Sequence, residues 1–313
     1  MLQALRATLC TVAASAAALA SAPALATTVQ VADDIMLLDA ARGRDLPIKV
    51  YFPQEPGRYP LIIFSHGLGG SKDDYEYLGR YWASRGYVSI HPQHHGSDRA
   101  LVTPGKPIKN ANAISRAEHD EKNWTDRPKD ISFVISSLAE LEAKAPGLKD
   151  KIDAGHIGVG GHSFGAHTAM VIAGGELSLG GHLTSLKDDR PRAFIALSPQ
   201  GEGTFGWTEH SWDKIRAPMM TMSGTLDRGM EGQPAEWRRS AFKHMPAGDK
   251  FQVVIEEATH FTFAGNAGER FLRPIEELTT AFWDAYLKDN AKERERLKSG
   301  AAWAGSGVRL QSK

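Results

Sequence analysis

The chain has 313 residues, of which 42% are apolar and 24% charged, with 37 basic and 37 acidic side chains. This composition is typical of a globular protein that is long enough to bury a substantial core. The balanced charge provides neither the basic excess of a nucleic-acid-binding protein nor the acidic run of a disordered tail. We therefore expect no nucleic acid among its partners.

The first 26 residues differ from the rest of the chain. Arg6 precedes an Ala-rich apolar run over 7–22, which ends in Pro23-Ala24-Leu25-Ala26, an Ala-x-Ala cleavage signature. The pattern predicts a signal peptide over residues 1–26, cleaved after Ala26, and hence a periplasmic or secreted protein without a stable membrane anchor. A transmembrane anchor is the alternative, but Ala and Ser make the run weakly hydrophobic. Residues 27–313 would then form a single catalytic domain.

The only cysteine, Cys10, lies in this leader. The mature protein is therefore expected to contain no disulfide, no thiolate nucleophile and no metal site built on cysteine.

Taken in chain order, the apolar pattern first predicts strands. Alternating residues around 29–31 and over 46–52 indicate two half-buried strands joined by a turn at 42–44. Short continuous apolar runs indicate strands that are covered on both faces. Residues 61–64 form such a run, and further strands are expected at 87–90, 156–160, 193–197, 219–222 and 251–255.

Helical spacing between these strands predicts the helices. Ser71 resembles the N-cap of a helix that ends near Gly86, and Pro128 is expected to open the next helix, which reaches Leu141. Two more helices are expected over 164–173 and 270–287. Three segments are expected to lack regular structure: the polar segment containing Gly96, Pro104 and Pro107, the insertion 174–189, and the tail after Glu293, which we expect to fray. This alternation predicts an α/β fold with a mostly parallel central sheet, helices on both faces and an antiparallel N-terminal hairpin.

One motif carries a chemical prediction. Gly161-His162-Ser163-Phe164-Gly165 fits G-x-S-x-G, and it lies between a predicted strand and a predicted helix, as a nucleophile elbow does. Such a turn exposes the serine hydroxyl, and side chains at the two glycines would strike the neighbouring helix and strand. We therefore predict that Ser163 is a nucleophile, rather than an incidental serine in a Gly-rich turn.

A serine hydroxyl needs a base, and the usual order in this fold is serine, acid, histidine. His260 follows the last predicted strand and Asp227 follows the strand at 219–222, so both are expected at the carboxyl edge of the sheet. Other histidines and aspartates follow Ser163, but none has this placement at the end of a strand. The rivals considered for the two roles are His182, His210 and His244, and Asp213 and Asp249.

The oxyanion of the reaction needs two backbone N–H donors. Phe164 supplies the one after the nucleophile, and Leu68, in Ser65-His66-Gly67-Leu68-Gly69-Gly70, is the expected second donor. His66 is expected to organise this loop rather than to transfer protons.

These motifs resemble those of the α/β-hydrolase superfamily, over nearly all of the mature chain. Phe64-Ser65-His66-Gly67-Leu68-Gly69 and the serine motif are similar to the platelet-activating factor acetylhydrolase and dienelactone hydrolase-like branch. The resemblance implies the same assignment of Ser163, Asp227, His260, Leu68 and Phe164. Dienelactone hydrolases have cysteine where this chain has Ser163, so dienelactone is not the expected substrate.

The remaining candidates concern the pocket. Phe205, Trp207 and Trp212 are predicted to line an apolar substrate site, and Phe261 to narrow its leaving-group side. His91, His94 and His95 could ligate a metal, but no carboxylate or thiolate accompanies them at ligand spacing, so we expect them to shape the pocket rim.

Together these features predict a monomeric serine esterase that hydrolyses short-chain or soluble carboxylic esters through an acyl-enzyme, with no metal or organic cofactor and a small ester as its partner. A phospholipid, lipase-like or polyester acyl hydrolase is the related alternative, and a peptidase is less expected. A catalytically silent binding protein is the alternative from another class.

Overall fold

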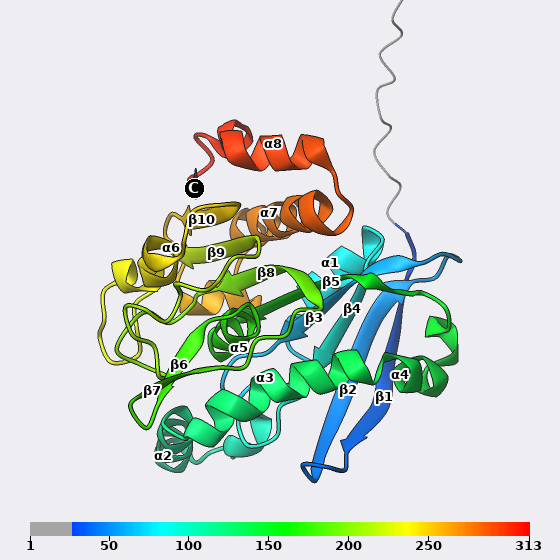
Figure 1. Ribbon diagram of the computed structural model, residues 1–313, viewed down its shortest axis with the longest axis horizontal. Coiled ribbons are helices and arrows are strands. Elements are labelled where there is room, and N and C mark those ends of the chain that lie inside the picture. Colours follow the sequence, from blue (N-terminus) through cyan, green and yellow to red (C-terminus); the bar gives the residue numbers. More distant parts are fainter. Residues whose placement is uncertain (1–26) are drawn as a thin grey trace, which may run out of the picture.

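The computed structural model describes residues 27–313, so the predicted signal peptide and Cys10 lie outside the described residues (Figure 1). A nine-stranded sheet crosses the molecule. Its strands are, in spatial order, β1 (Val29–Asp39), β2 (Arg44–Pro53), β4 (Val88–Pro92), β3 (Tyr59–Ser65), β5 (Ile152–His162), β8 (Pro191–Leu197), β9 (Met219–Gly224), β10 (Lys250–Ile255) and β11 (Val308–Ser312).

The centre of the sheet is parallel and its two edges are antiparallel. Strands from β4 through β3, β5, β8 and β9 to β10 pair in parallel, whereas β1–β2, β2–β4 and β10–β11 pair antiparallel. The predicted α/β-hydrolase architecture, including the N-terminal hairpin, is therefore confirmed. Because the parallel strands share one direction, the loops after β3, β5, β8, β9 and β10 meet at a single edge of the sheet.

Helices cover both faces of the sheet (Figure 1). One core packs α3 (Glu121–Ser136), α4 (Leu138–Lys144), α5 (Phe164–Ile172) and α6 (Ser240–His244) against the sheet. The other core holds α1 (Glu76–Ser84), α7 (Glu269–Leu287) and α8 (Ala291–Ser299). The apolar residues of the central strands are almost fully buried, as expected of parallel strands that are covered on both faces. Short 3-10 helices complete the chain: η1 (Arg99–Leu101), η2 (Pro146–Leu148), η3 (Ala235–Arg239), η4 (His260–Ala264) and η5 (Ala301–Trp303).

Three predictions about the helices were wrong: one helix was not predicted, and two helices begin at other residues than expected. The segment expected as a polar loop contains helix α2 (Pro107–Glu118), with Pro107 in its first turn, where a missing N–H costs nothing. Pro128 lies inside α3, whose true start is capped by Asp120: its Oδ1 accepts the Lys122 N–H at 3.0 Å. Helix α1 begins at Glu76, after Tyr75, whose left-handed backbone (φ 62°) interrupts the helix; Ser71 lies in a separate turn, where its N–H donates to Asp74 Oδ2.

Two segments expected to be irregular are ordered. The insertion after α5 forms a separate hairpin of β6 (Glu176–Leu179) and β7 (His182–Ser185). The C-terminal tail does not fray: Asn290 caps α8, Leu297 and Trp303 are buried, and β11 pairs with β10. A few apolar anchors in a highly charged stretch were too weak a signal to predict this packing.

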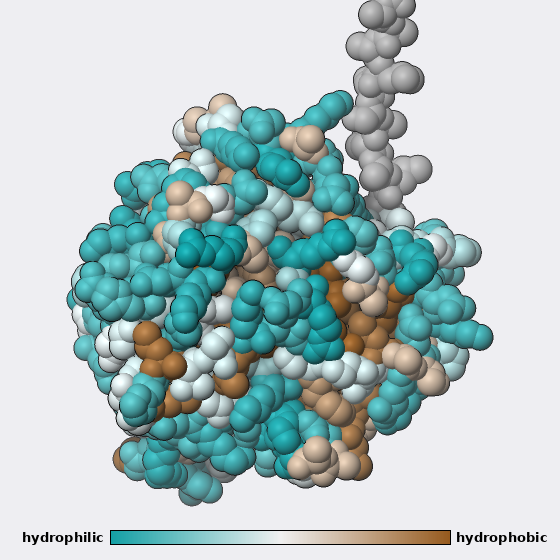
Figure 2. All heavy atoms as spheres, viewed as in Figure 1, coloured by the Kyte–Doolittle hydropathy of each residue, from teal (hydrophilic) through white to brown (hydrophobic). Residues whose placement is uncertain are grey.

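Figure 2 shows that the visible face is mainly hydrophilic, with hydrophobic spheres gathered over the region of β1 and β2. Met36 and Leu38 of β1 are among the exposed large apolar side chains. Among the helices of residues 27–313, none combines the length and the apolar character that crossing a membrane would require.

Candidate active site

Ser163 occupies a strained turn between β5 and α5. Its backbone has φ 55° and ψ −118°, a region that residues with a side chain rarely adopt. A Cβ at Gly161 would collide with the carbonyl group of Gly165, and one at Gly165 would collide with the Ser65 carbonyl. The Ser163 N–H donates to Leu197 O at 2.9 Å, which anchors the turn to β8. The two glycines are therefore needed for steric reasons, as the motif predicted.

The structure brings Ser163, His260 and Asp227 together from three strand ends. Ser163 Oγ lies 3.0 Å from His260 Nε2, and His260 Nδ1 lies 3.2 Å from Asp227 Oδ1. Asp227 is fully buried, whereas Ser163 and His260 are partly accessible. For Nε2 to accept the Ser163 proton, the neutral imidazole must carry its proton on Nδ1, where Asp227 can accept it.

Two residues that the sequence analysis missed hold the Asp227 carboxylate. Ser198, which directly follows β8, donates to Asp227 Oδ2 at 2.6 Å, and its Oγ lies 2.6 Å from His260 Nδ1. Arg238 Nε donates to Asp227 Oδ1 at 3.0 Å, and the guanidinium also binds the carbonyl oxygens of Pro199 and Arg228. The position of Ser198 at a strand end resembles that of Ser163 and was a usable signal, but nothing in the sequence pointed to Arg238.

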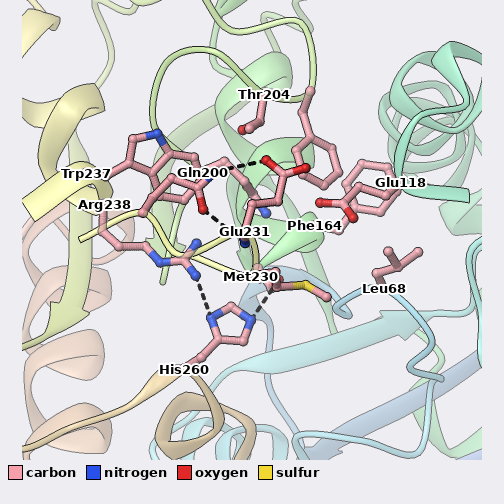
Figure 3. Close-up of a pocket in the computed structure, with 13 residues that line it drawn as sticks. Leu68, Glu118, Phe164, Gln200, Thr204, Met230, Glu231, Trp237, Arg238 and His260 are labelled. Atoms are coloured by element: carbon pink, nitrogen blue, oxygen red, sulfur yellow. Dashed lines mark hydrogen bonds between the residues drawn. The ribbon is translucent and has the colours of Figure 1, made fainter. Parts of the chain in front are cut away.

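These contacts set the charge of the site. Burial raises the pKa of the Asp227 carboxyl, but the His260 hydrogen bond and the Arg238 charge outweigh it, so the pKa lies below its usual value. Asp227 is therefore held as a carboxylate. Arg238 Nη2 also lies 3.1 Å from His260 Nδ1, so a fixed positive charge stands beside the imidazole (Figure 3).

The two amides predicted for the oxyanion lie beside Ser163. Leu68 and Phe164 line the same pocket as Ser163, and no hydrogen bond recorded between residues 27–313 uses the Leu68 N–H. The Phe164 N–H belongs to the first turn of α5, where N–H groups have no partner within the helix. Both amides are thus available to a bound oxygen.

The loop that carries Leu68 is held from below by buried side chains. His66 donates from Nδ1 to Gly67 O at 2.6 Å and accepts the His94 N–H at Nε2, so it organises the loop. Arg127 of α3 donates to the His66 carbonyl and to Ser65 Oγ, and its guanidinium lies 4.5 Å from the centre of the Phe164 ring. Arg127 was also missed from the sequence.

A chain of hydrogen bonds links this loop to the base. The Gly67 N–H donates to Tyr75 Oη at 3.2 Å, Tyr75 Oη lies 2.8 Å from His162 Nδ1, and His162 Nε2 lies 3.0 Å from His260 O. Because a carbonyl only accepts, His162 carries its proton on Nε2 and accepts the Tyr75 proton at Nδ1. Burial lowers the pKa of His162 well below its usual value, with a further contribution from His260, which keeps this ring neutral.

Two openings meet at Ser163. We call the first the closed pocket; its volume is about 30 Å³, and Figure 3 shows its lining. The second, the open cleft, has about 280 Å³ and lies between Gly69, Tyr75, His162 and Phe261. Ser163, His260 and Leu68 line both openings. If a carbonyl group is bound at Ser163 Oγ, one of its substituents can therefore occupy the closed pocket and the other the open cleft.

The predicted aromatic lining is correct only in part. Phe205 lines the closed pocket, and Phe261, which is 67% exposed, lines the open cleft. Trp207 lines a neighbouring cavity of about 340 Å³ instead. Trp212 was wrongly predicted: it is fully buried in the core, stacks on Trp207 at 5.3 Å between ring centres, and lines none of these spaces. Trp212 is a core residue, and the sequence pattern alone could not distinguish it from a residue that lines the pocket.

The rival residues lie elsewhere. His244 lies in α6 near Glu202 and Glu209, and His210 pairs with Asp213 on the surface. His182 is an exposed residue of β7, and Asp249 lies just before β10, near Lys298. None of them contacts Ser163.

Of the three histidines at the end of β4, His91 and His94 are buried in hydrogen-bond networks, whereas His95 is exposed. His91 bonds Ser89, and His94 bonds Ser65 Oγ at 2.9 Å and Asp130 Oδ2 at 3.0 Å. Within residues 27–313, no group of three or more His, Cys, Asp or Glu side chains is placed to hold a metal ion. His91 and His94 therefore support the loops below the site, and the expectation that they form the pocket rim was wrong.

A strained serine at the end of a parallel strand, with a histidine and an acid on later strand ends, places the protein in the α/β-hydrolase superfamily. The chlorophyllase family model matches residues 26–200, so the chain belongs to the chlorophyllase family. It is 26% identical to a platelet-activating factor acetylhydrolase of Cavia porcellus, over 70% of this chain and 51% of that protein.

Other relatives agree with this placement. A platelet-activating factor acetylhydrolase of Bos taurus is 31% identical over 66% of this chain and 49% of its own length. Cutinase est1 of Thermobifida alba is 24% identical over 68% of this chain and 57% of its own length. The chain thus spans about half the length of the curated relatives it matches.

Proposed function

We propose that the chain is a serine esterase that cleaves carboxylic esters through an acyl-enzyme. Ser163 Oγ attacks the ester carbonyl while His260 Nε2 takes its proton, and His260 then returns the proton to the leaving alcohol. Asp227 orients the imidazole and stabilises its charged form, and the N–H groups of Leu68 and Phe164 bind the oxyanion. Water repeats these steps on the acyl-enzyme and releases the acid.

One observation carries the proposal: the 3.0 Å contact between Ser163 Oγ and His260 Nε2, at a strained turn that opens into two pockets. A silent binding protein would not need its serine held in a strained conformation beside a base. The names of the relatives, acetylhydrolase and cutinase, also support ester hydrolysis. The mechanism requires no metal or organic cofactor.

The two openings suggest which part of the ester lies where. His260 must reach the leaving oxygen, and the open cleft surrounds His260 with Phe261, Ala264 and His162, so we place the alcohol there. The acyl group then enters the closed pocket, beside Phe164. A water needs about 10–15 Å³ on the same scale, so a cavity of about 30 Å³ suits an acyl group of a few carbons.

A second candidate is hydrolysis of a water-insoluble or polymeric ester. Two large apolar side chains that line the openings are exposed: Met230 at 68% and Phe261 at 67%. Such a rim could rest on an apolar surface, and several relatives are named cutinases. The short-ester proposal remains the main one, because the closed pocket is small.

The setting of the enzyme is proposed from the sequence. The charged, Ala-rich leader over 1–26 supports export to the periplasm or the medium, and residues 27–313 are proposed to act as one catalytic domain in a monomer.

A panel of p-nitrophenyl esters tests the proposal. We expect acetate and butyrate to be cleaved with a much higher kcat/KM than dodecanoate, and Ser163→Ala to abolish turnover while circular dichroism and Tm stay unchanged. Undiminished hydrolysis by Ser163→Ala would refute the mechanism. Efficient cleavage of long esters or of a polyester film would favour the second candidate.

A further inference from the structure

The outer end of the closed pocket carries two carboxylates. Glu118, at the end of α2, and Glu231, in the loop after β9, both line it, and Figure 3 shows their carboxylates facing each other across the space beside Thr204. We call this place the acidic mouth. The ion pairs formed within residues 27–313 include neither carboxylate. Two negative charges therefore face one space with no cation between them.

This arrangement has an electrostatic cost. Burial raises the pKa of the Glu118 carboxyl, His119 lowers it by less, and the negative charge of Glu231 adds a smaller rise, so that the pKa lies above its usual value. A cation held between the two carboxylates would relieve both effects, whereas an anion would add a third negative charge.

One residue of the closed-pocket lining has a buried acceptor without a partner. Gln200 is only 4% exposed, and its Oε1 has no hydrogen-bond partner. Several N–H donors of the lining are already used: Trp237 Nε1 donates to Glu202 O at 2.9 Å, and Gln233 Nε2 donates to Glu231 Oε2 at 3.1 Å. An unpaired buried oxygen is unfavourable, so the pocket lacks a donor that a ligand could bring.

Aromatic rings extend the acidic mouth outward. The neighbouring cavity of about 340 Å³ shares Glu118, Thr204, Phe205 and Glu231 with the closed pocket. It adds Trp124, whose ring centre lies 6.2 Å from that of Phe205. Aromatic faces beside carboxylates are a favourable environment for an ammonium group.

We propose that the acidic mouth binds an ammonium group carried by the acyl part of the ester, a few bonds from the scissile carbonyl. The cation lies between Glu118 and Glu231 against the rings of Trp124 and Phe205, and Gln200 Oε1 accepts from a donor nearer the carbonyl when the acyl chain offers one. This proposal rests on the esterase proposed above and specifies its substrate class. Acyl groups with a second carboxylate are excluded by repulsion.

Matched methyl esters test the proposal at low salt. Methyl 4-(trimethylammonio)butyrate has the shape of methyl 5,5-dimethylhexanoate but carries a positive charge, and monomethyl glutarate supplies the negative charge. We expect kcat/KM to be about tenfold higher for the cation than for the neutral ester, and lowest for the anion. The preference should shrink as sodium chloride screens the charges.

Variants then locate the effect. In Glu118→Gln/Glu231→Gln the cation-to-neutral ratio of kcat/KM should fall toward one, whereas Glu140→Gln/Glu295→Gln, which neutralises two exposed glutamates outside the pocket, should keep it. A wild-type ratio of one or less, or a ratio that the first variant leaves unchanged, would refute the cation site while p-nitrophenyl acetate hydrolysis still supported the esterase.

A second pair of esters tests where the cation lies. Acetylcholine and 3,3-dimethylbutyl acetate carry the same contrast on the alcohol. A preference confined to this pair would contradict the placement on the acyl side, and a protein that cleaves no ester at all would refute both proposals.

Discussion

The structure contains two Ser–His–Asp arrangements with nearly the same hydrogen-bond lengths. In the first, Ser163 Oγ lies 3.0 Å from His260 Nε2, and His260 Nδ1 lies 3.2 Å from Asp227. In the second, Ser65 Oγ lies 2.9 Å from His94 Nε2, and His94 Nδ1 lies 3.0 Å from Asp130. The two differ in everything that surrounds these bonds.

Ser65, His94 and Asp130 are completely buried, and Ser65 Oγ also accepts a hydrogen bond from Arg127. Burial and the Arg127 charge lower the pKa of His94 to about 4, so this ring resists taking up a proton. Ser163, by contrast, is strained and opens into two pockets beside free amides. Triad geometry alone therefore does not define a nucleophile: access for the substrate, hydrogen-bond donors for the oxyanion and a base that can take up a proton are also needed.

Substitutions of the two acids, Asp227 and Asp130, should differ most in their effects on kcat. Asp227→Asn is expected to lower kcat about 10⁴-fold, because the imidazole loses the acceptor that fixes its tautomer, and to lower stability as well, because the buried Arg238 loses its carboxylate partner. Asp130→Asn should leave the buried Arg44 poorly compensated and cost about 3–5 kcal/mol of unfolding free energy, a fall in Tm of roughly 10 °C, without a comparable loss of kcat in the folded protein. Steady-state kinetics and calorimetry measure the two effects, and equal kinetic losses would contradict the distinction.

The buried histidines should make stability depend on pH. Burial lowers the pKa of His91 and His167 to about 3, that of His94 to about 4, and those of His66 and His162 well below the usual value. Between pH about 6.5 and 4 the unfolded chain therefore binds protons that the folded protein excludes, so stability falls as the pH falls. Urea unfolding at a series of pH values measures the slope.

A pair of variants assigns part of that slope. His94→Gln should flatten it by up to one proton, about 1.4 kcal/mol per pH unit, whereas His210→Gln, on the surface, should not change it. A stability that is flat between pH 6.5 and 4 would show that the histidines are not held neutral.

Tyr75→Phe tests the link between the oxyanion loop and the base. It removes the hydroxyl that accepts from the Gly67 N–H and donates to His162, while the ring that packs against Phe64 remains. We expect kcat to fall about tenfold with little change in KM, because the loop and His260 lose a shared support. Tyr81→Phe, a matched change outside the site, should leave kcat unchanged. An unchanged kcat in Tyr75→Phe would show that the hydrogen bonds from Gly67 through Tyr75 and His162 to His260 do not support catalysis.

Ser65→Ala should have the smallest effect on activity. It breaks the contacts of Ser65 with Arg127 and His94 and should cost about 1–3 kcal/mol of stability, yet kcat should stay within about threefold of wild type. A loss comparable to that of Ser163→Ala would mean that the buried arrangement takes part in the reaction.

The sequence predicted the first arrangement because its parts obey a local rule. Ser163 lies in a motif with fixed spacing, and Asp227 and His260 lie in the loops that follow two of the predicted strands. The parallel sheet then brings these ends together. Leu68 and Phe164 could be predicted for the same reason.

The second arrangement and the supports of the site were not predictable in this way. Asp130 and Arg127 lie within a helix whose start was misplaced at Pro128, and Arg238 lies in a short 3-10 helix without a motif. Their roles arise from contacts between distant segments: Arg127 reaches Ser65, and Arg238 reaches Asp227. Likewise, Trp212 was assigned to the pocket because one sequence cannot tell a core ring from a lining ring.

Covalent labelling with a fluorophosphonate, followed by proteolysis and mass spectrometry, tests the central claim most directly. The account predicts one phosphonyl group per chain, attached to Ser163, and none on Ser65, with labelling abolished in Ser163→Ala and retained in Ser65→Ala. A folded protein that remains unlabelled, or one that carries the label on another serine, would contradict it.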